Sequence, residues 1–432
     1  MKRLTFKYLS IICCALAVSC TYEYEADIPT DDNIVVIDGR IVTGITSSLT
    51  ISKATKLDGK TSYGEISAKA RIECEDGSVI EGYASSFVIE GYATSLYNDL
   101  PGYSSYFTRD YSPTISFDTR NLDPSKKYRV YIDAGEDGIF ESDWMSVYKA
   151  PVIDDLSYRV VDNVGVGEKA LDFRVSAHSD SPYFAVSYLE AWEHTSLTTT
   201  LLEYFPETNT VGEGSWKGLE HPQYRCWQES DTPITVISSA AHAENKIVDA
   251  YLARLSQYNI KISVLYRMIV TVASTSKEYY DYWDNLRKVS YVDGDLFTPI
   301  PSNMEGNIHR KSGKGTVIGY LGASEAAIDT LYYRNRGFYR WPREYSSRLD
   351  ELMYYHRNYE EPGDLNEYYC PSRKDWPRAY ETGNVPIREA SNEQGFIPNM
   401  YVWGRKECVD CRYLGGNYQF PSDWPDRDDP NL

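Results

Sequence analysis

The chain has 432 residues, of which 42% are apolar and 25% charged, and its formal net charge is −19. This composition is typical of a folded globular protein and excludes an intrinsically disordered one. The strong negative charge also disfavours nucleic acid and anionic membrane surfaces as general partners. The length allows two domains.

The first 20 residues have the pattern of a secretory signal. Basic residues precede an apolar run at residues 9–18, which is too short to span a membrane. The segment Leu16–Cys20 resembles a bacterial lipobox, and this resemblance implies that Cys20 is diacylated and becomes the mature N-terminus. An ordinary secretion signal with an incidental cysteine is the alternative. We therefore expect a signal peptide at residues 1–19 and a lipid anchor on Cys20.

An acidic tether follows at residues 20–32. Glu23, Glu25 and Asp27 stand at alternate positions just after Cys20. Such a pattern resembles the surface-export signal of Bacteroidota lipoproteins, which implies that the protein faces the cell exterior. A merely solvated acidic linker is the alternative.

Residues 33–150 read as a series of short strands. Alternating or β-branched runs are separated by turns rich in Gly, Pro and Asp, and a hairpin signal lies at Asp76-Gly77. The runs lie at residues 34–42, 49–54, 68–74, 114–117 and 127–134. This spacing predicts an immunoglobulin-like β-sandwich.

Residues 151–432 are predicted to form a larger, β-rich C-terminal domain. It begins with strands at residues 156–161, 170–177 and 183–192. A short helix is expected from the capping box Thr275–Glu278, after which Tyr279, Trp283 and Leu286 share one face. Regular periodicity fades after Leu331, so we expect a long irregular C-terminal region. The fold class is therefore mainly β, with one or a few short helices.

Five cysteines remain after the signal peptide and the lipid site are set aside. The cell envelope outside the inner membrane favours disulfides. We expect the pairs Cys408–Cys411 and Cys226–Cys370, with Cys74 as a buried strand residue. A zinc site at Cys408 and Cys411 would need two further ligands, which no second CxxC or HxxxH motif supplies. No metal is expected.

Catalytic signatures are scarce. The HExxH and GxSxG motifs are missing, and Ser312–Thr316 lacks the offsets of a phosphate-binding loop. The loop that starts at Asp133 has Trp144 where a calcium loop needs a carboxylate. We therefore predict no enzyme activity and no cofactor. A surface glycan or peptide hydrolase built from distant carboxylates is the alternative.

Four segments together carry a family resemblance. They are Val35–Ile41, Ser276–Tyr282, Pro301–Asn307 with Val317–Ser324, and the tail Glu407–Trp424, which contains a Cys-x-x-Cys-Arg motif. In order and character they resemble the Bacteroidota lipoprotein family called domain of unknown function 4249, over essentially the mature chain. The chain departs from the family pattern at Ile308–Lys314 and Arg334–Tyr380.

Members of that family are commonly encoded beside TonB-dependent outer-membrane receptors, and no enzyme activity is attached to them. The resemblance implies an outer-membrane lipoprotein that partners a TonB-dependent receptor β-barrel in nutrient uptake, with an unknown ligand. A structural envelope lipoprotein without a ligand is a further alternative.

A partner surface is expected in the second domain, in the Tyr-, Arg- and Trp-rich stretch Tyr332–Trp376. Such residue types are enriched at interface hot spots, and local arginines suit a negative partner. The alternative is that the aromatic residues form core and the arginines pair with nearby acids. The candidates are Arg336, Tyr339, Arg340, Trp341, Arg343, Tyr354, Tyr355 and Trp376.

Overall fold

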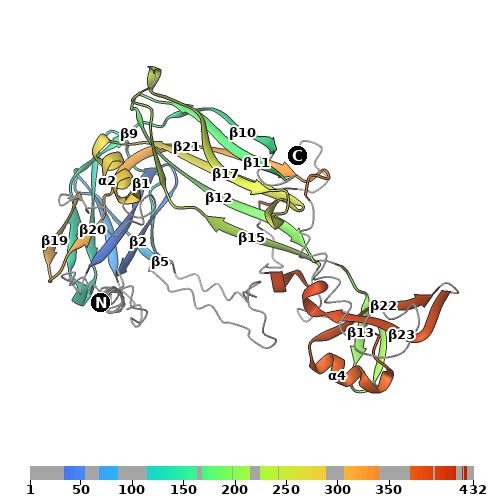
Figure 1. Cartoon of the computed structure of the whole chain (residues 1–432). Coiled ribbons are helices and arrows are strands. Elements are labelled where there is room, and N and C mark those ends of the chain that lie inside the picture. Colours follow the sequence, from blue (N-terminus) through green and yellow to red (C-terminus); the bar gives the residue numbers. More distant parts are fainter. Residues whose placement is uncertain are drawn as a thin grey trace, which may run out of the picture.

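Figure 1 shows the computed structural model of the chain. It describes residues 34–53, 68–85, 114–162, 168–196, 198–214, 224–241, 243–288, 306–339, 370–392, 395–414, 421 and 423–425. The predicted signal peptide, Cys20 and the acidic tether lie outside the described residues. The prediction of a mainly β fold with a few short helices is confirmed.

The N-terminal part is a β-sandwich. One sheet contains β20 (Val317–Ile318), β1 (Val35–Thr43), β2 (Thr46–Lys53), β6 (Thr114–Asp118) and β5 (Tyr83–Ser85). The other contains β4 (Val79–Glu81), β3 (Lys69–Cys74), β7 (Lys127–Asp133), β8 (Ile139–Ser142) and β19 (Ile308–Ser312). Alternate residues such as Ile37 and Ile72 point into the shared core, as the period of two predicts. Cys74 is buried there, as expected.

Strands from beyond residue 150 complete this first sandwich. β19 extends one sheet beside β8, and β20 runs parallel to β1 in the other. Ile308, Leu321 and Ala323 belong to the same core as the residues of β1 and β7. The first core therefore includes residues that lie more than 160 positions further along the chain than its other strands.

A second sandwich follows. Its first sheet contains β10 (Val152–Asp162), β11 (Lys169–His178) and β17 (Lys246–Ser256). Its second contains β12 (Tyr183–Thr195), β15 (Arg225–Asp231), β16 (Thr235–Ser238), β18 (Leu265–Ser274) and β21 (Gly322–Arg334). Phe173, Phe184 and Tyr266 lie in the core between the two sheets.

Strand β21 belongs to both sandwiches (Figure 1). Its first residues pair with β1 and with β9 (Met145–Tyr148), and its later ones pair antiparallel with β18. Arg40 on β1 reaches across the junction and donates hydrogen bonds to the carbonyl of Ala185 and to Ser187 on β12. The two sandwiches are thus joined by a shared backbone strand and by a buried side chain.

The predicted helix is confirmed as α2 (Lys277–Arg287), next to the junction. Its N-cap is Ser276, one residue later than the capping-box pattern suggests, because the Ser276 Oγ accepts the Tyr279 N–H at 3.0 Å. Tyr279 and Tyr282 are buried. Short 3-10 turns occur at η1 (Gly135–Asp137), η2 (Ala243–Asn245) and η3 (Ile260–Ile262).

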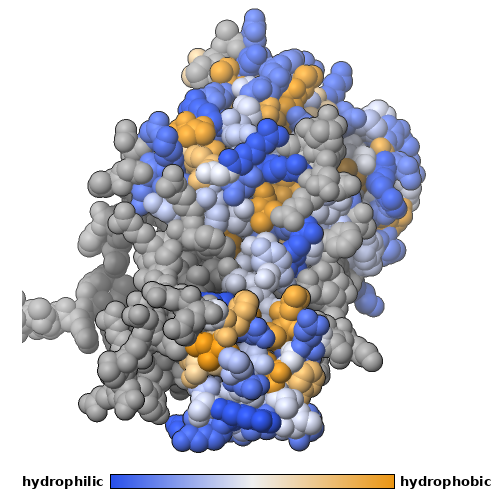
Figure 2. Space-filling model, turned by 90° about the vertical axis from the view of Figure 1, so that its right-hand side faces the viewer, coloured by the Kyte–Doolittle hydropathy of each residue, from blue (hydrophilic) through white to orange (hydrophobic). Residues whose placement is uncertain are grey.

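A separate C-terminal lobe combines two distant segments (Figure 1). It contains β13 (Leu202–Phe205), β14 (Thr210–Glu213), η5 (Arg373–Asp375), α4 (Trp376–Glu381), β22 (Asn384–Asn392) and β23 (Gly395–Arg405). Tyr204, Trp376, Ala379 and Trp403 form its core. Figure 2 shows apolar patches on its surface. The described part of the C-terminal region is therefore more regular than the sequence suggests.

One disulfide ties this lobe to the second sandwich. Cys226 on β15 bonds Cys411 in η7 (Cys411–Leu414), with the two Cα atoms 5.8 Å apart. The predicted pairs Cys408–Cys411 and Cys226–Cys370 are therefore wrong. Cys408 ends η6 (Lys406–Cys408) and is buried among Val385, Ile387 and Val409, whereas the following turn brings Cys411 against β15. The CxxC segment is thus two successive turns whose cysteines lie in different surroundings.

Candidate binding surface

The sheet β10–β11–β17 has one face in the core and one face outside. On β11, Leu171, Phe173 and Val175 are fully buried in the core of the second sandwich. Because strand side chains alternate, Asp172 and Arg174 lie on the opposite face. We call this opposite side the β10–β11–β17 face. It is formed by Asp155, Ser157, Arg159, Asp172, Arg174, Ser176, Asp249, Tyr251 and Arg254.

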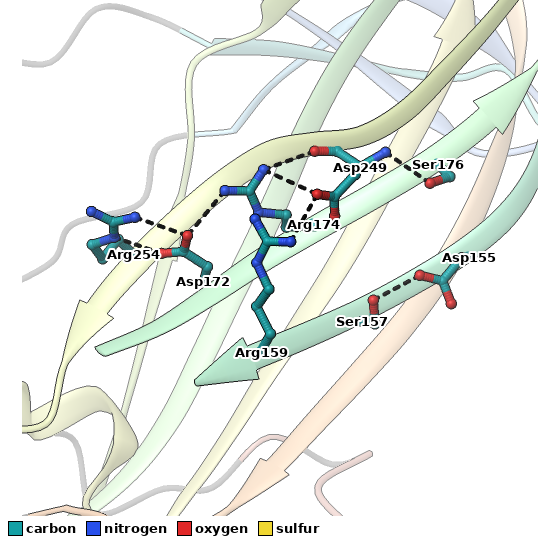
Figure 3. A network of polar contacts seen from close by, with 8 residues as sticks. All are labelled: Asp155, Ser157, Arg159, Asp172, Arg174, Ser176, Asp249 and Arg254. Atoms are coloured by element: carbon teal, nitrogen blue, oxygen red, sulfur yellow. Dashed lines mark hydrogen bonds and ion pairs between the residues drawn. The ribbon is translucent and has the colours of Figure 1, made fainter. Parts of the chain in front are cut away.

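Asp172 stands at the centre of this face (Figure 3). Its carboxylate accepts hydrogen bonds from Arg254 at 2.5 and 2.9 Å and from Arg174 at 3.0 Å, and its side chain is only 1% exposed. These donors, Arg254 foremost, lower the pKa of Asp172 to about 2. The carboxylate is therefore ionised at neutral pH and holds two guanidinium groups in fixed positions.

Asp249 fixes a third arginine. β17 has a bulge here, because Val248 and Asp249 together stand opposite the single residue Ser176. Asp249 has a positive φ of 54°, and its N–H donates to Ser176 Oγ at 3.0 Å. Its carboxylate then accepts Arg159 at 3.0 Å and lies 3.5 Å from Arg174. The bulge turns the Asp249 carboxylate toward the arginines of the neighbouring strands.

Large side chains reach solvent around these charges. Tyr251 is 54% exposed, and the guanidinium of Arg174 lies 5.6 Å from the centre of its ring. Val248 is 68% exposed beside them. Arginine and tyrosine held in fixed positions are the residue types that dominate protein interfaces, since little side-chain entropy is lost on binding.

The charges on this face are balanced. Arg159, Arg174 and Arg254 are matched by Asp172 and Asp249, together with Asp155, which accepts a hydrogen bond from Ser157 at 2.7 Å. A balanced array of fixed opposite charges suits a specific protein partner, whereas a polyanion requires an excess of cations. Among the described strands β10 pairs only with β11, so the face ends in an edge strand.

The residues predicted as a partner surface are spread over different surroundings. Arg336 is exposed just after β21, whereas Tyr339 packs partly against the core of the second sandwich. Trp376 is 2% exposed in the core of the C-terminal lobe, so its assignment to a partner surface is corrected: its ring packs against Tyr204 and Trp403. The candidates Arg340, Trp341, Arg343, Tyr354 and Tyr355 lie outside the described residues.

The sequence did not lead us to predict the β10–β11–β17 face, although the residue pattern of one of its strands indicates a polar face. Asp172, Arg174 and Ser176 alternate with apolar residues in a predicted strand, which indicates one polar face. Asp249 and Arg254 lie some 75 residues or more further along the chain, and their pairing with β11 depends on strand register.

Two further features are absent from the residues that the structure describes. In these ranges no group of three or more His, Cys, Asp or Glu residues is arranged to hold a metal ion. No described helix is long and apolar enough to cross a membrane.

Comparison with known proteins gives one family match. The family model described as domain of unknown function (DUF4249) matches residues 21–329. No curated protein matches the chain. The matched range contains every residue of the β10–β11–β17 face and ends within β21.

Proposed function

The chain belongs to the family of domain of unknown function 4249, and we propose that it is a lipid-anchored outer-membrane protein that binds a TonB-dependent transporter and assists nutrient uptake. The observation that carries this proposal is the β10–β11–β17 face, where a buried aspartate holds arginines in place beside an exposed tyrosine. The lipobox at Cys20 supports the location.

The segment between Cys20 and the first described strand is long enough for the anchored protein to reach a neighbouring transporter. Residues 21–34 separate Cys20 from the first described strand, β1, and a chain of that length spans at most about 50 Å. Acyl chains on Cys20 hold the protein at the membrane through burial worth about 0.8 kcal/mol per CH₂. A tether of this reach allows the sandwiches to meet the exterior loops of a neighbouring β-barrel.

The face suits a protein partner better than a small ligand. Its arginines lie side by side on three paired strands and are already paired with acids, so recognition depends on the spacing of charges and rings over a wide area. Arg159 and Arg254 have side chains that are 53% and 46% exposed, and both keep free surface for a partner.

Affinity purification of the tagged, full-length protein from detergent-solubilised membranes tests the proposal. We expect a β-barrel receptor to co-purify in a fixed ratio. Recovery of the tagged protein alone contradicts a stable transporter partner. Turnover of a glycan or peptide by the purified protein would instead support the hydrolase alternative.

A further inference from the structure

Arg267 is a buried arginine on the outer side of the second sandwich. On β18, Tyr266 and Met268 point into the core, so Arg267 between them points to the opposite face of the sheet. Its side chain is nevertheless only 4% exposed. Small Ala191 lies beside it on β12, in direct register. Something on this outer face must therefore cover the guanidinium group.

The cover is a turn near the C-terminus. The Trp424 N–H donates to the Pro421 carbonyl at 2.9 Å, and this hydrogen bond closes the turn that carries Asp423 and Trp424. From this turn the Asp423 carboxylate accepts Arg267 Nη1 at 2.7 Å. The Trp424 ring lies over the same guanidinium, with its centre 5.4 Å from Cζ. An acid and an aromatic ring from one turn thus engage one arginine.

Arg267 has a second acidic neighbour that belongs to the sheet itself. Glu229 on β15 lies 3.5 Å from Arg267 Nη2, and its side chain is 50% exposed. The charge of Arg267 would keep this partner if the turn moved away. Asp423 is 67% exposed, so the turn lies over Arg267 without being enclosed. The turn can therefore move away from Arg267 without leaving the charge of this buried arginine unpaired.

We propose that Arg267, Glu229 and Ala191 form a recognition site for a turn in which an aspartate precedes a tryptophan, and that the C-terminal turn is its exchangeable internal occupant. A partner segment of the same chemistry takes the site when it displaces the C-terminal turn. The site lies on the outer side of the β12–β18 sheet, whereas the β10–β11–β17 face lies on the other sheet, so this inference is independent of the proposed function.

Tethering explains why the site is filled by the chain's own turn. A segment of the same chain can reach an effective concentration of about millimolar at the site, because it is covalently linked to it. A peptide in solution therefore competes poorly with the C-terminal turn. Variants that weaken the contacts of this turn should make the site available to the peptide. The bond between Arg267 and Asp423 is charge-assisted, and the ring contact adds a cation–π contribution, so removing both should favour the competitor by at least about tenfold.

The test uses a fluorescent peptide of sequence Pro-Ser-Asp-Trp-Pro and the full-length protein. We expect the double variant Asp423→Asn with Trp424→Ala to bind this peptide at least about tenfold more tightly than the unmodified protein does, because the internal competitor is weakened. Adding Arg267→Met to the double variant should abolish binding. A peptide in which asparagine replaces the aspartate should not bind, and Asp118→Asn in the first sandwich is the matched control.

Three outcomes overturn the proposal. Equal affinity of the unmodified protein and the double variant would show that the internal turn does not compete. The absence of peptide binding by the folded double variant would show that the site does not recognise this chemistry in another molecule. A double variant that no longer melts cooperatively would show that the turn is a fixed part of the fold.

Discussion

Arg40 of the first sandwich donates a hydrogen bond to the carbonyl oxygen of Ala185 in the second, over 3.3 Å. The other end of its guanidinium donates to Ser187 Oγ at 3.1 Å, and the residue is 8% exposed. Burial lowers the pKa of this guanidinium. The junction between the sandwiches is thus held by a polar side chain in low-dielectric surroundings, where a hydrogen bond is stronger than in water.

Replacing Arg40 by Met should destabilise the junction. The Ala185 carbonyl then loses a donor, and a buried acceptor left unsatisfied costs about 1–3 kcal/mol. We expect the free energy of unfolding to fall by about 2 kcal/mol in urea titrations followed by tryptophan fluorescence. Arg120→Ala removes an exposed arginine paired with Asp118 and should cost less than about 0.5 kcal/mol. Equal losses in the two variants would contradict this role of Arg40.

The structure predicts that Cys226 and Cys411 are joined in the purified protein. Mass spectrometry of unreduced, alkylated protein should find the peptides of Cys226 and Cys411 joined, because their Cα atoms are 5.8 Å apart. Cys226→Ser should lower the free energy of unfolding by about 3 kcal/mol, since the bond closes a long loop. Cys370→Ala should leave the cross-link intact. Finding Cys226 joined to Cys370 instead would refute the pairing.

His194 links stability to pH. It is fully buried beside the disulfide, with Nε2 lying 3.4 Å from the Cys411 carbonyl, and burial lowers its pKa from 6.5 to about 4. Between these values the unfolded chain binds a proton that the folded protein does not. The contribution of His194 to the free energy of unfolding is therefore fully present above pH 6.5 and is lost as the pH falls toward 4.

His194→Gln should remove that part of the pH dependence. Urea titrations from pH 7 to pH 4 should show that the unmodified protein loses about 3 kcal/mol more than the variant does. Carboxylates titrate in both proteins and cancel in the difference. Parallel losses in the two proteins would show that His194 takes up its proton equally well in the folded state.

The lipid anchor makes a prediction about location. If Cys20 carries the proposed acyl chains, Cys20→Ser removes the thiol to which they attach, so the protein should leave the outer-membrane fraction or remain uncleaved. Fractionation combined with a fatty-acid probe measures this. Unchanged membrane fractionation, with no label on the unmodified protein, would contradict lipidation.

Local features of this fold could be predicted from the sequence, and features that depend on distant residues could not. The strand at Leu171–Ala177 and the helix after Ser276 follow from side-chain periodicity and from one capping hydroxyl. The pairing of β21 with strands of both sandwiches could not be predicted, because its contact with β1 joins positions about 280 residues apart.

The same distinction explains the errors at the candidate sites. A CxxC spacing suggests a local disulfide, but two successive turns point Cys408 and Cys411 to different partners. A Trp- and Arg-rich composition suggests an interface, but the sequence does not reveal that Tyr204 and Trp403 enclose Trp376. The pairing of Asp172 with Arg254 depends on register between β11 and β17, which the composition of neither strand determines.

The most direct test of the proposed function compares face variants in the affinity purification. The double variant Arg159→Ala with Arg254→Ala removes two half-exposed arginines from the β10–β11–β17 face, and Arg120→Ala removes a similarly exposed arginine elsewhere. We predict that the double variant, which remains folded because Arg174 still pairs with Asp172, co-purifies at least about tenfold less of the β-barrel, whereas the control co-purifies as much as the unmodified protein does. Full recovery of the β-barrel with the folded double variant would contradict the assignment of this face as the transporter-binding surface.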